Sequence, residues 1–172
     1  MTRIKNILVP VDFSDASKQA LRYACELAGT FEASLHVLYA AENLFVRSGY
    51  TEFYPLPQEF FDQIEQEARK QLEMLLTTEE QARYGAVLVY RTGAPAQEIL
   101  DYVRAEGHID LIVMATHGRG GVARLMMGSV ADKVVRAAPC PVLTLRLPGE
   151  STGQTSRAAC GGSSSKSRLA RT

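Results

Sequence analysis

Two hydrophobic periodicities alternate along residues 6–147. Short apolar runs, typical of strands buried on both faces, occur at 6–12, 34–40, 86–92, 110–115 and 141–147. The segments between them are longer, and most repeat apolar residues every three or four positions, the spacing that gathers them on one face of a helix. This alternation predicts helices that connect successive strands.

Signals at the segment ends support two of these helices. The first helix follows the first strand and has Ser14 as its predicted N-cap, with Gly29 near its C-cap. Another is predicted at 94–107, where Pro95 lies in the first turn and Gly107 follows the end. Residues that favour helix starts and stops therefore agree with the periodicity.

Two further helices are predicted less directly. One begins at about Leu56, and its apolar stripe comprises Phe61, Ile64, Ala68, Leu72 and Leu75. The last is predicted at 129–138, where Ser129 and Asp132 have the spacing of a capping box.

The connection at 41–57 is long for an α/β unit, in which about 2 to 6 residues are usual. Its aromatic residues are Phe45, Tyr50, Phe53 and Tyr54. They either pack locally beneath the loop or form a lid or partner surface.

Apolar strands joined by helices predict an α/β fold with right-handed crossovers. It is an open five-stranded parallel sheet with helices on both faces, Rossmann-like. Ligands bind such sheets at the carboxyl ends of the strands, near the point where the strand order reverses. Asp12 ends the first strand and Ala115 the fourth. We therefore expect Asp12 to face the segment after Ala115 across a crevice.

That segment, "ATHGRGG", has the chemistry of an anion-binding loop. Gly118, Gly120 and Gly121 permit positive φ angles and let backbone N–H groups approach a ligand closely. Arg119 within the turn and Arg124 beyond it either screen phosphate charge or are solvated.

The same segment leads to the amino terminus of the last helix. Gly128 and Ser129 open this helix, and the free N–H groups and dipole at that end favour a negative charge. The Ser129 hydroxyl can donate to a phosphate while its backbone caps the helix.

Other phosphate-binding loops fail specific tests. The chain contains no Gly-Lys-Ser/Thr triplet, which a Walker A loop requires. A dinucleotide fingerprint follows the first strand, whereas this cluster follows the fourth and has Ala123 in place of the third glycine. Where a response regulator carries its phosphoacceptor aspartate, the third strand ends in Arg91, Thr92 and Gly93.

Composition fits one soluble domain, since the chain has 172 residues of which 46% are hydrophobic. The formal net charge is zero, yet residues 149–172 carry four bases against Glu150 alone. We expect this Gly/Ser-rich tail, 148–172, to be disordered, either as a solvated extension or as a contact for an anionic partner. Bases elsewhere are scattered among acids, which argues against a nucleic-acid interface.

No apolar run approaches the about 18 residues of a membrane helix, and Asp12 interrupts the first apolar run. We therefore expect a cytoplasmic protein without a membrane span. Cys25, Cys140 and Cys160 are widely spaced and odd in number, so neither a disulfide framework nor a zinc site is predicted.

Several segments together resemble the universal stress protein family. "ILVPVDFSD", "LHVLYA", "GAPAQEIL" and the stretch from Asp110 to Leu145 carry the similarity, which covers about residues 3–147. The nucleotide-binding branch of this family has the pattern G-x2-G-x9-G-[S/T]. The spacing is intact here, but Ala115 replaces the first glycine, and its methyl group adds bulk beside a ligand.

The resemblance implies a domain at 1–147 with strand order 3-2-1-4-5 and a site for ATP, ADP or AMP. Pro10, Val11 and Asp12 would lie on the adenosine side, Val37 at the adenine, and Gly118, Gly128 and Ser129 at the ribose and phosphates. The full predicted cofactor-binding set is Pro10, Val11, Asp12, Val37, Ala115, His117, Gly118, Arg119, Gly120, Gly121, Gly128, Ser129 and Val130.

Asp12 has two alternative roles, as an acceptor for a ribose hydroxyl or adenine amino group, or as a cap at the start of the first helix. His117 either donates to a phosphate or its metal or makes local hydrogen bonds. The sequence suggests no built-in metal site, so we expect any Mg²⁺ to arrive with the nucleotide.

The predicted crevice lacks a catalytic set, because Asp12 is the only carboxylate placed there. The primary hypothesis is a cytoplasmic nucleotide-binding stress or regulatory module in which hydrolysis is slow or absent. A second is an ATPase or phosphotransferase that uses Asp12 to orient water, and a third is a scaffold that binds no nucleotide. The resemblance further implies a homodimer through strand 141–147, and an unidentified protein partner is expected.

Overall fold

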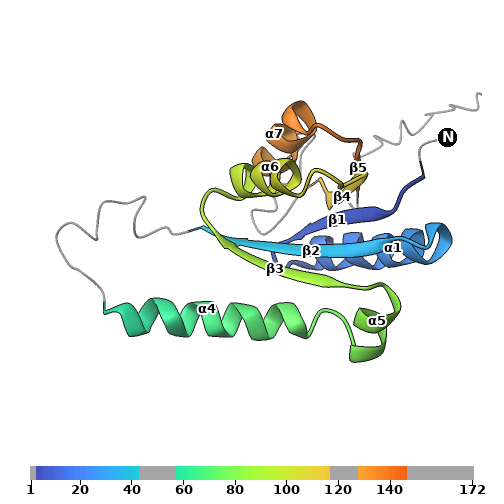
Figure 1. Ribbon diagram of the computed structural model, residues 1–172. Helices are drawn as coiled ribbons and strands as arrows, with labels where there is room; N and C mark the ends of the chain where they lie inside the picture. Colours follow the sequence, from blue (N-terminus) through green and yellow to red (C-terminus); the bar gives the residue numbers. More distant parts are fainter. Residues whose placement is uncertain (1–2, 43–56, 117–127, 147–172) are drawn as a thin grey trace, which may run out of the picture.

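The computed structural model describes residues 3–42, 57–116 and 128–146. Its centre is a five-stranded parallel sheet in the order β3-β2-β1-β4-β5, as predicted (Figure 1). The strands are β1 (Asn6–Val11), β2 (Ser34–Ala41), β3 (Val87–Thr92), β4 (Leu111–Ala115) and β5 (Val142–Leu145). The helices are α1 (Asp15–Phe31), α4 (Gln58–Glu73), α5 (Thr78–Arg83), α6 (Pro95–Glu106) and α7 (Ser129–Ala137).

Helices cover both faces of the sheet (Figure 1). Alternate residues of each central strand point to opposite faces, so β1 supplies Ile7 and Val9 to one apolar cluster and Leu8 to the other. The first cluster is completed by α1 and α4, and the second by α6 and α7. Burial on both faces explains why the central strands are continuous apolar runs.

The predicted start of α1 is confirmed, and its predicted end is adjusted. Ser14 is the N-cap, and its hydroxyl accepts a hydrogen bond from the Ser17 N–H. The helix continues through Gly29 to Phe31, and Glu32 forms the left-handed C-cap with φ 53°. In α6, Gly107 takes the left-handed conformation after the last turn, as predicted, with φ 65°.

The segment between α4 and β3 contains a helix that the apolar periodicity did not indicate. In α5, the Thr77 hydroxyl accepts from the Glu80 N–H, and the Glu80 carboxylate accepts from the Thr77 N–H at 2.8 Å. This reciprocal capping box stabilises a helix with no buried residue. The Thr-x-x-Glu spacing at 77–80 was the sequence signal for it.

The capping box predicted for the last helix is wrong. Gly128 is the N-cap of α7 and Ser129 is already its first helical residue, so the Ser129 hydroxyl is one position too late for that role. The Asp132 carboxylate instead accepts from Arg136 at 3.0 Å, one helical turn further on.

The remaining boundaries shift slightly. The second predicted helix begins at Gln58 rather than Leu56, and Leu75 lies beyond its end at Glu73 while still packing on the core. The structure shortens the predicted strand 141–147 to the four residues of β5. Within the described ranges, no helix combines the length and the hydropathy needed to cross a membrane.

Candidate functional site

The strand order reverses between β1 and β4, and these two strands pair over only a short stretch. Their ladder joins Ile7 to Leu111 and Leu8 to Ile112. After these residues, β1 pairs with β2 as far as Val11, and β4 pairs with β5 as far as Ala115. The two strands thus stop pairing with each other toward their carboxyl ends, where an open α/β sheet forms its ligand crevice.

Asp12 lies at this edge, directly after β1, and is half-buried. Its Oδ1 accepts hydrogen bonds from the Ser14 N–H at 3.1 Å and from the Ser14 hydroxyl at 2.5 Å. Ser14 in turn caps α1, and the buried Ser17 hydroxyl accepts from the Asp12 N–H. The carboxylate is therefore oriented by the same groups that begin the first helix.

The turn between β1 and α1 holds a non-glycine residue in a costly conformation. Phe13 has φ 65°, which bulky side chains rarely adopt. Its ring stacks on Tyr39 of β2, with 4.4 Å between the ring centroids. These two residues also line a surface groove of ≈ 310 Å³ with residues of α4. A strained turn of this kind persists where the surrounding structure holds it in place. Here the turn places the carboxylate of Asp12 at the end of β1.

On the other side of the switch point lie the end of β4 and the start of α7. The Thr116 N–H donates to the Leu145 carbonyl at 2.9 Å, which continues the pairing with β5 by one residue. The Gly128 N–H donates to the Thr116 carbonyl at 2.7 Å. This bond joins Thr116 to Gly128 and sets the amino terminus of α7 beside the carboxyl end of β4.

The amino terminus of α7 has backbone donors to offer. No side chain among the described residues caps this helix, since its N-cap is Gly128. The first N–H groups of a helix lack intrahelical acceptors, and the helix dipole adds partial positive charge there. Ser129 is exposed and Val130 half-buried at this end. An anion is the natural ligand for this arrangement.

The other predicted site residues are distributed as follows. Pro10 and Ala115 are half-buried strand residues at the same edge of the sheet. Val11 is 5% exposed and Val37 is completely buried in the apolar cluster shared with α1 and α4, so Val37 presents no accessible side-chain surface. His117, Gly118, Arg119, Gly120 and Gly121 lie outside the described residues.

Four residues that shape this edge were not predicted as site residues: Phe13, Ser17, Tyr39 and Thr116. Ser17 and Thr116 carry hydroxyls next to strand ends, which the sequence could have indicated. The left-handed turn at Phe13 had no signal, because neither glycine nor asparagine occupies that position. Within the described ranges, no three His, Cys, Asp or Glu side chains are grouped as metal ligands would be.

The sheet order defines a doubly wound α/β protein whose topological switch point lies between β1 and β4. The chain belongs to the universal stress protein family, whose family model matches residues 3–146. It is 36% identical over 145 residues to the universal stress protein YxiE of Bacillus subtilis, covering 81% of this chain and 97% of the relative. It is 32% identical over 148 residues to universal stress protein MJ0531 of Methanocaldococcus jannaschii, covering 84% and 83%.

Solved structures share the fold. Protein MJ0577 of M. jannaschii has 25% identity and a TM-score of 0.71, covering 86% of this chain and 99% of that one. A universal stress protein in complex with cAMP has 22% identity and a TM-score of 0.59, covering 84% and 99%. The Archaeoglobus fulgidus protein in complex with dAMP has 22% identity and a TM-score of 0.54, covering 84% and 100%.

Proposed function

We propose that this chain binds an adenine nucleotide in the crevice between the carboxyl ends of β1 and β4, and acts as a cytoplasmic stress or regulatory module. The observation that carries the proposal is the Gly128–Thr116 hydrogen bond, which sets the amino terminus of α7 at the end of β4. The cAMP and dAMP bound by two proteins of the same fold support an adenine nucleotide as the ligand class.

In this proposal the adenosine lies on the β1 side. Asp12 accepts a hydrogen bond from a ribose hydroxyl or the adenine amino group, in a position fixed by its bonds to Ser14. This combines the two roles that the sequence leaves open, because the carboxylate supports the start of α1 and faces the ligand from there. Pro10 and Val11 form the strand end beneath it.

The phosphates lie on the α7 side. Phosphate oxygens accept hydrogen bonds from the N–H groups of Ser129 and Val130 and from the Ser129 hydroxyl. The anion-binding loop that the sequence predicts before α7 would add further backbone donors. ATP, ADP and AMP share this chemistry. The described residues fit a nucleotide better than a resident metal ion, since they bring no cluster of carboxylates or histidines to this edge. We expect any Mg²⁺ to enter with the nucleotide.

Binding is tested by calorimetric titration of ATP, ADP and AMP into the parent chain and Asp12→Asn. We expect saturable binding to the parent and about tenfold or greater weakening in Asp12→Asn, because hydrogen bonds to charged groups contribute about 1.5–3 kcal/mol. Asp15→Asn is the matched control, since it removes an exposed carboxylate three residues away. Equal weakening in both variants, or no binding to the parent, would contradict the proposal.

We further infer that hydrolysis is slow or absent. Asp12 is the carboxylate at the described part of the crevice, and its Oδ1 already accepts two hydrogen bonds from Ser14. These bonds favour a binding role over that of a general base, which must be open to a water molecule. Phosphate release should stay near the rate of a buffer blank that contains ATP and Mg²⁺. Turnover well above that blank, abolished by Asp12→Asn, would instead identify an ATPase or phosphotransferase.

A further inference from the structure

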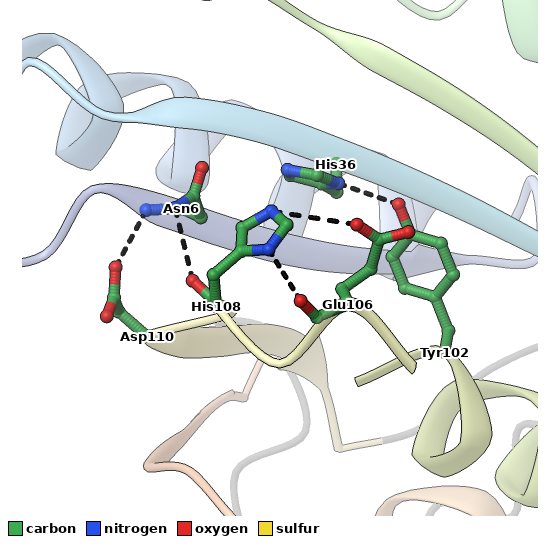
Figure 2. Close-up of polar contacts among 6 residues, drawn as sticks. All are labelled: Asn6, His36, Tyr102, Glu106, His108 and Asp110. Atoms are coloured by element: carbon green, nitrogen blue, oxygen red, sulfur yellow. Dashed lines mark hydrogen bonds and ion pairs between the residues drawn. The ribbon is translucent and has the colours of Figure 1, made fainter. Parts of the chain in front are cut away.

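A second polar cluster lies at the amino-terminal edge of the sheet, away from Asp12 and Ser129. It joins Asn6 of β1 and His36 of β2 to Tyr102 and Glu106 of α6 and to the turn at His108–Asp110 before β4 (Figure 2). The Nδ1 atom of His36 is 2.7 Å from the Tyr102 hydroxyl. The cluster thus ties the carboxyl-terminal half of α6 to the centre of the sheet.

His36 occupies an apolar site. It is only 5% exposed, and its partners in the strand register are Leu8 of β1 and Val87 of β3. Burial is the largest influence on this imidazole, and it lowers the pKa of His36 below the ordinary value of 6.5. Burial likewise raises the pKa of Tyr102 to about 12, so its hydroxyl keeps its proton near neutral pH. At neutral pH the pair is a hydrogen bond between two uncharged side chains.

The neighbouring histidine is arranged differently. The Nδ1 of His108 lies 2.6 Å from the carbonyl oxygen of Glu106, which can only accept, so Nδ1 carries the hydrogen. The Nε2 of His108 lies 3.6 Å from the Glu106 carboxylate, and half of its side chain is exposed. Protonated His108 therefore has an acceptor for each ring N–H, while its ring meets His36 edge-on at 5.7 Å between centroids.

The charged groups around His36 come from three elements. Glu106 favours a positive charge on His36, and a protonated His108 disfavours it. Arg91 of β3 lies over the Tyr102 ring, with 5.8 Å from its guanidinium carbon to the ring centroid. Asp110 accepts from the backbone N–H groups of Lys5 and Asn6. Burial outweighs these charges, so protonating His36 places an ill-solvated cation beneath α6.

We propose that His36 is a proton sensor that couples the attachment of the carboxyl-terminal half of α6 to pH. The hydrogen bond between His36 and Tyr102 holds α6 to β2, and the burial of the imidazole favours this arrangement while His36 is neutral. Acidification protonates His36 and favours states in which α6 moves away and the imidazolium reaches water.

The sign follows from proton linkage. The closed state holds fewer protons than the open state between the lowered pKa of His36 and the ordinary value of 6.5. Attachment of α6 is thus strongest above about pH 6.5, weakens as the pH falls through that window, and levels off below it. At pH 5.5 the opening constant rises by at most about tenfold, because one pH unit below the open-state pKa allows a factor of about ten.

Hydrogen exchange at pH 7.5 and pH 5.5, with rates divided by those of an unfolded peptide at the same pH, measures this opening. In the parent, we expect protection over 102–106 to fall by up to about tenfold at the lower pH and protection in α1 to fall less. In His36→Gln the difference between helices should disappear. In His108→Gln, the matched control, the difference should persist and be slightly smaller, because a neighbour that lowers the pKa of His36 is removed.

Equal pH dependence in the parent and His36→Gln would overturn the proposal. The NMR titration of the parent's His36 ring protons decides the matter if His36→Gln does not fold. A midpoint below 6.5, with α6 protection lost between pH 6.5 and that midpoint and level below it, supports the sensor. A midpoint at 6.5 or above, or α6 protection that does not fall between pH 6.5 and the midpoint, overturns it.

Discussion

At the residue scale, three side chains at the turn after β1 have two structural roles. Asp12, Ser14 and Ser17 form a chain of hydrogen bonds that both caps α1 and fixes a carboxylate at the sheet edge. The sequence predicted Ser14 as a cap and Asp12 as a strand-end residue. The sequence did not predict the hydrogen bonds from Ser14 to the Asp12 carboxylate, because they depend on the left-handed turn at Phe13.

The Ser14→Ala variant should therefore be less stable by about 0.5–2 kcal/mol, the usual loss when alanine replaces an N-cap serine. The substitution also removes a donor to Asp12, so weaker nucleotide binding is expected with it. Urea unfolding measures the first effect. Thr30→Ala is the control, because it removes an exposed hydroxyl that bonds only within its own helix in α1. An equal loss in both variants would contradict the role of Ser14.

At the element scale, helix ends explain most of the differences between expectation and structure. Gly29 is a typical stop residue, yet α1 passes through it because Glu32 takes the left-handed position. Gly107 does end α6, as its sequence position predicts. Apolar periodicity did not predict the short helix α5, because this helix has no buried residue. The Thr-x-x-Glu spacing of its capping box was nevertheless a sequence signal.

Substitution of Gly29 and Gly107 by alanine should change the free energy of unfolding in opposite directions. Gly29→Ala should stabilise the protein by about 0.5–1 kcal/mol, because the site is helical and a Cβ atom there meets nothing closer than 3.9 Å. Gly107→Ala should destabilise it by about 1 kcal/mol, because φ is 65° even though the space is open. Thermal unfolding of both variants compares them directly, and shifts of the same sign would contradict these backbone assignments.

At the scale of the whole molecule, the strand order decides where a ligand can bind. The alternation of apolar runs with helical segments predicted the parallel sheet, because strands buried on both faces leave a strong apolar pattern. The family resemblance predicted the strand order. The site was predicted less completely. The family resemblance assigned Val37 to the adenine side of the site, whereas its side chain is buried within the core. Neither the strained turn nor the Phe13–Tyr39 stack has a local sequence signal.

We infer from the family resemblance that the chain forms a homodimer through the edge of the sheet at β5 (Val142–Leu145). The carbonyls of Pro141 and Leu145 accept from β4, so the N–H of Thr144, one residue away from Leu145, points to the outer edge. Thr144→Pro removes that donor and leaves the pairing with β4 in place. We expect the parent to be a dimer and the variant a monomer by light scattering. A variant that remains dimeric would exclude pairing through this edge.

Adenine-nucleotide binding at the crevice between β1 and β4 is the central claim, and amide NMR tests it most directly. On titration of AMP or ATP into the ¹⁵N-labelled full chain, the amides of Asp12, Ser129 and Val130 should shift saturably at one common dissociation constant. The amide chemical shifts of residues around His36, at the opposite edge of the sheet, should not change. No saturable shift at millimolar nucleotide, or shifts confined to residues away from Asp12 and Ser129, would contradict the claim.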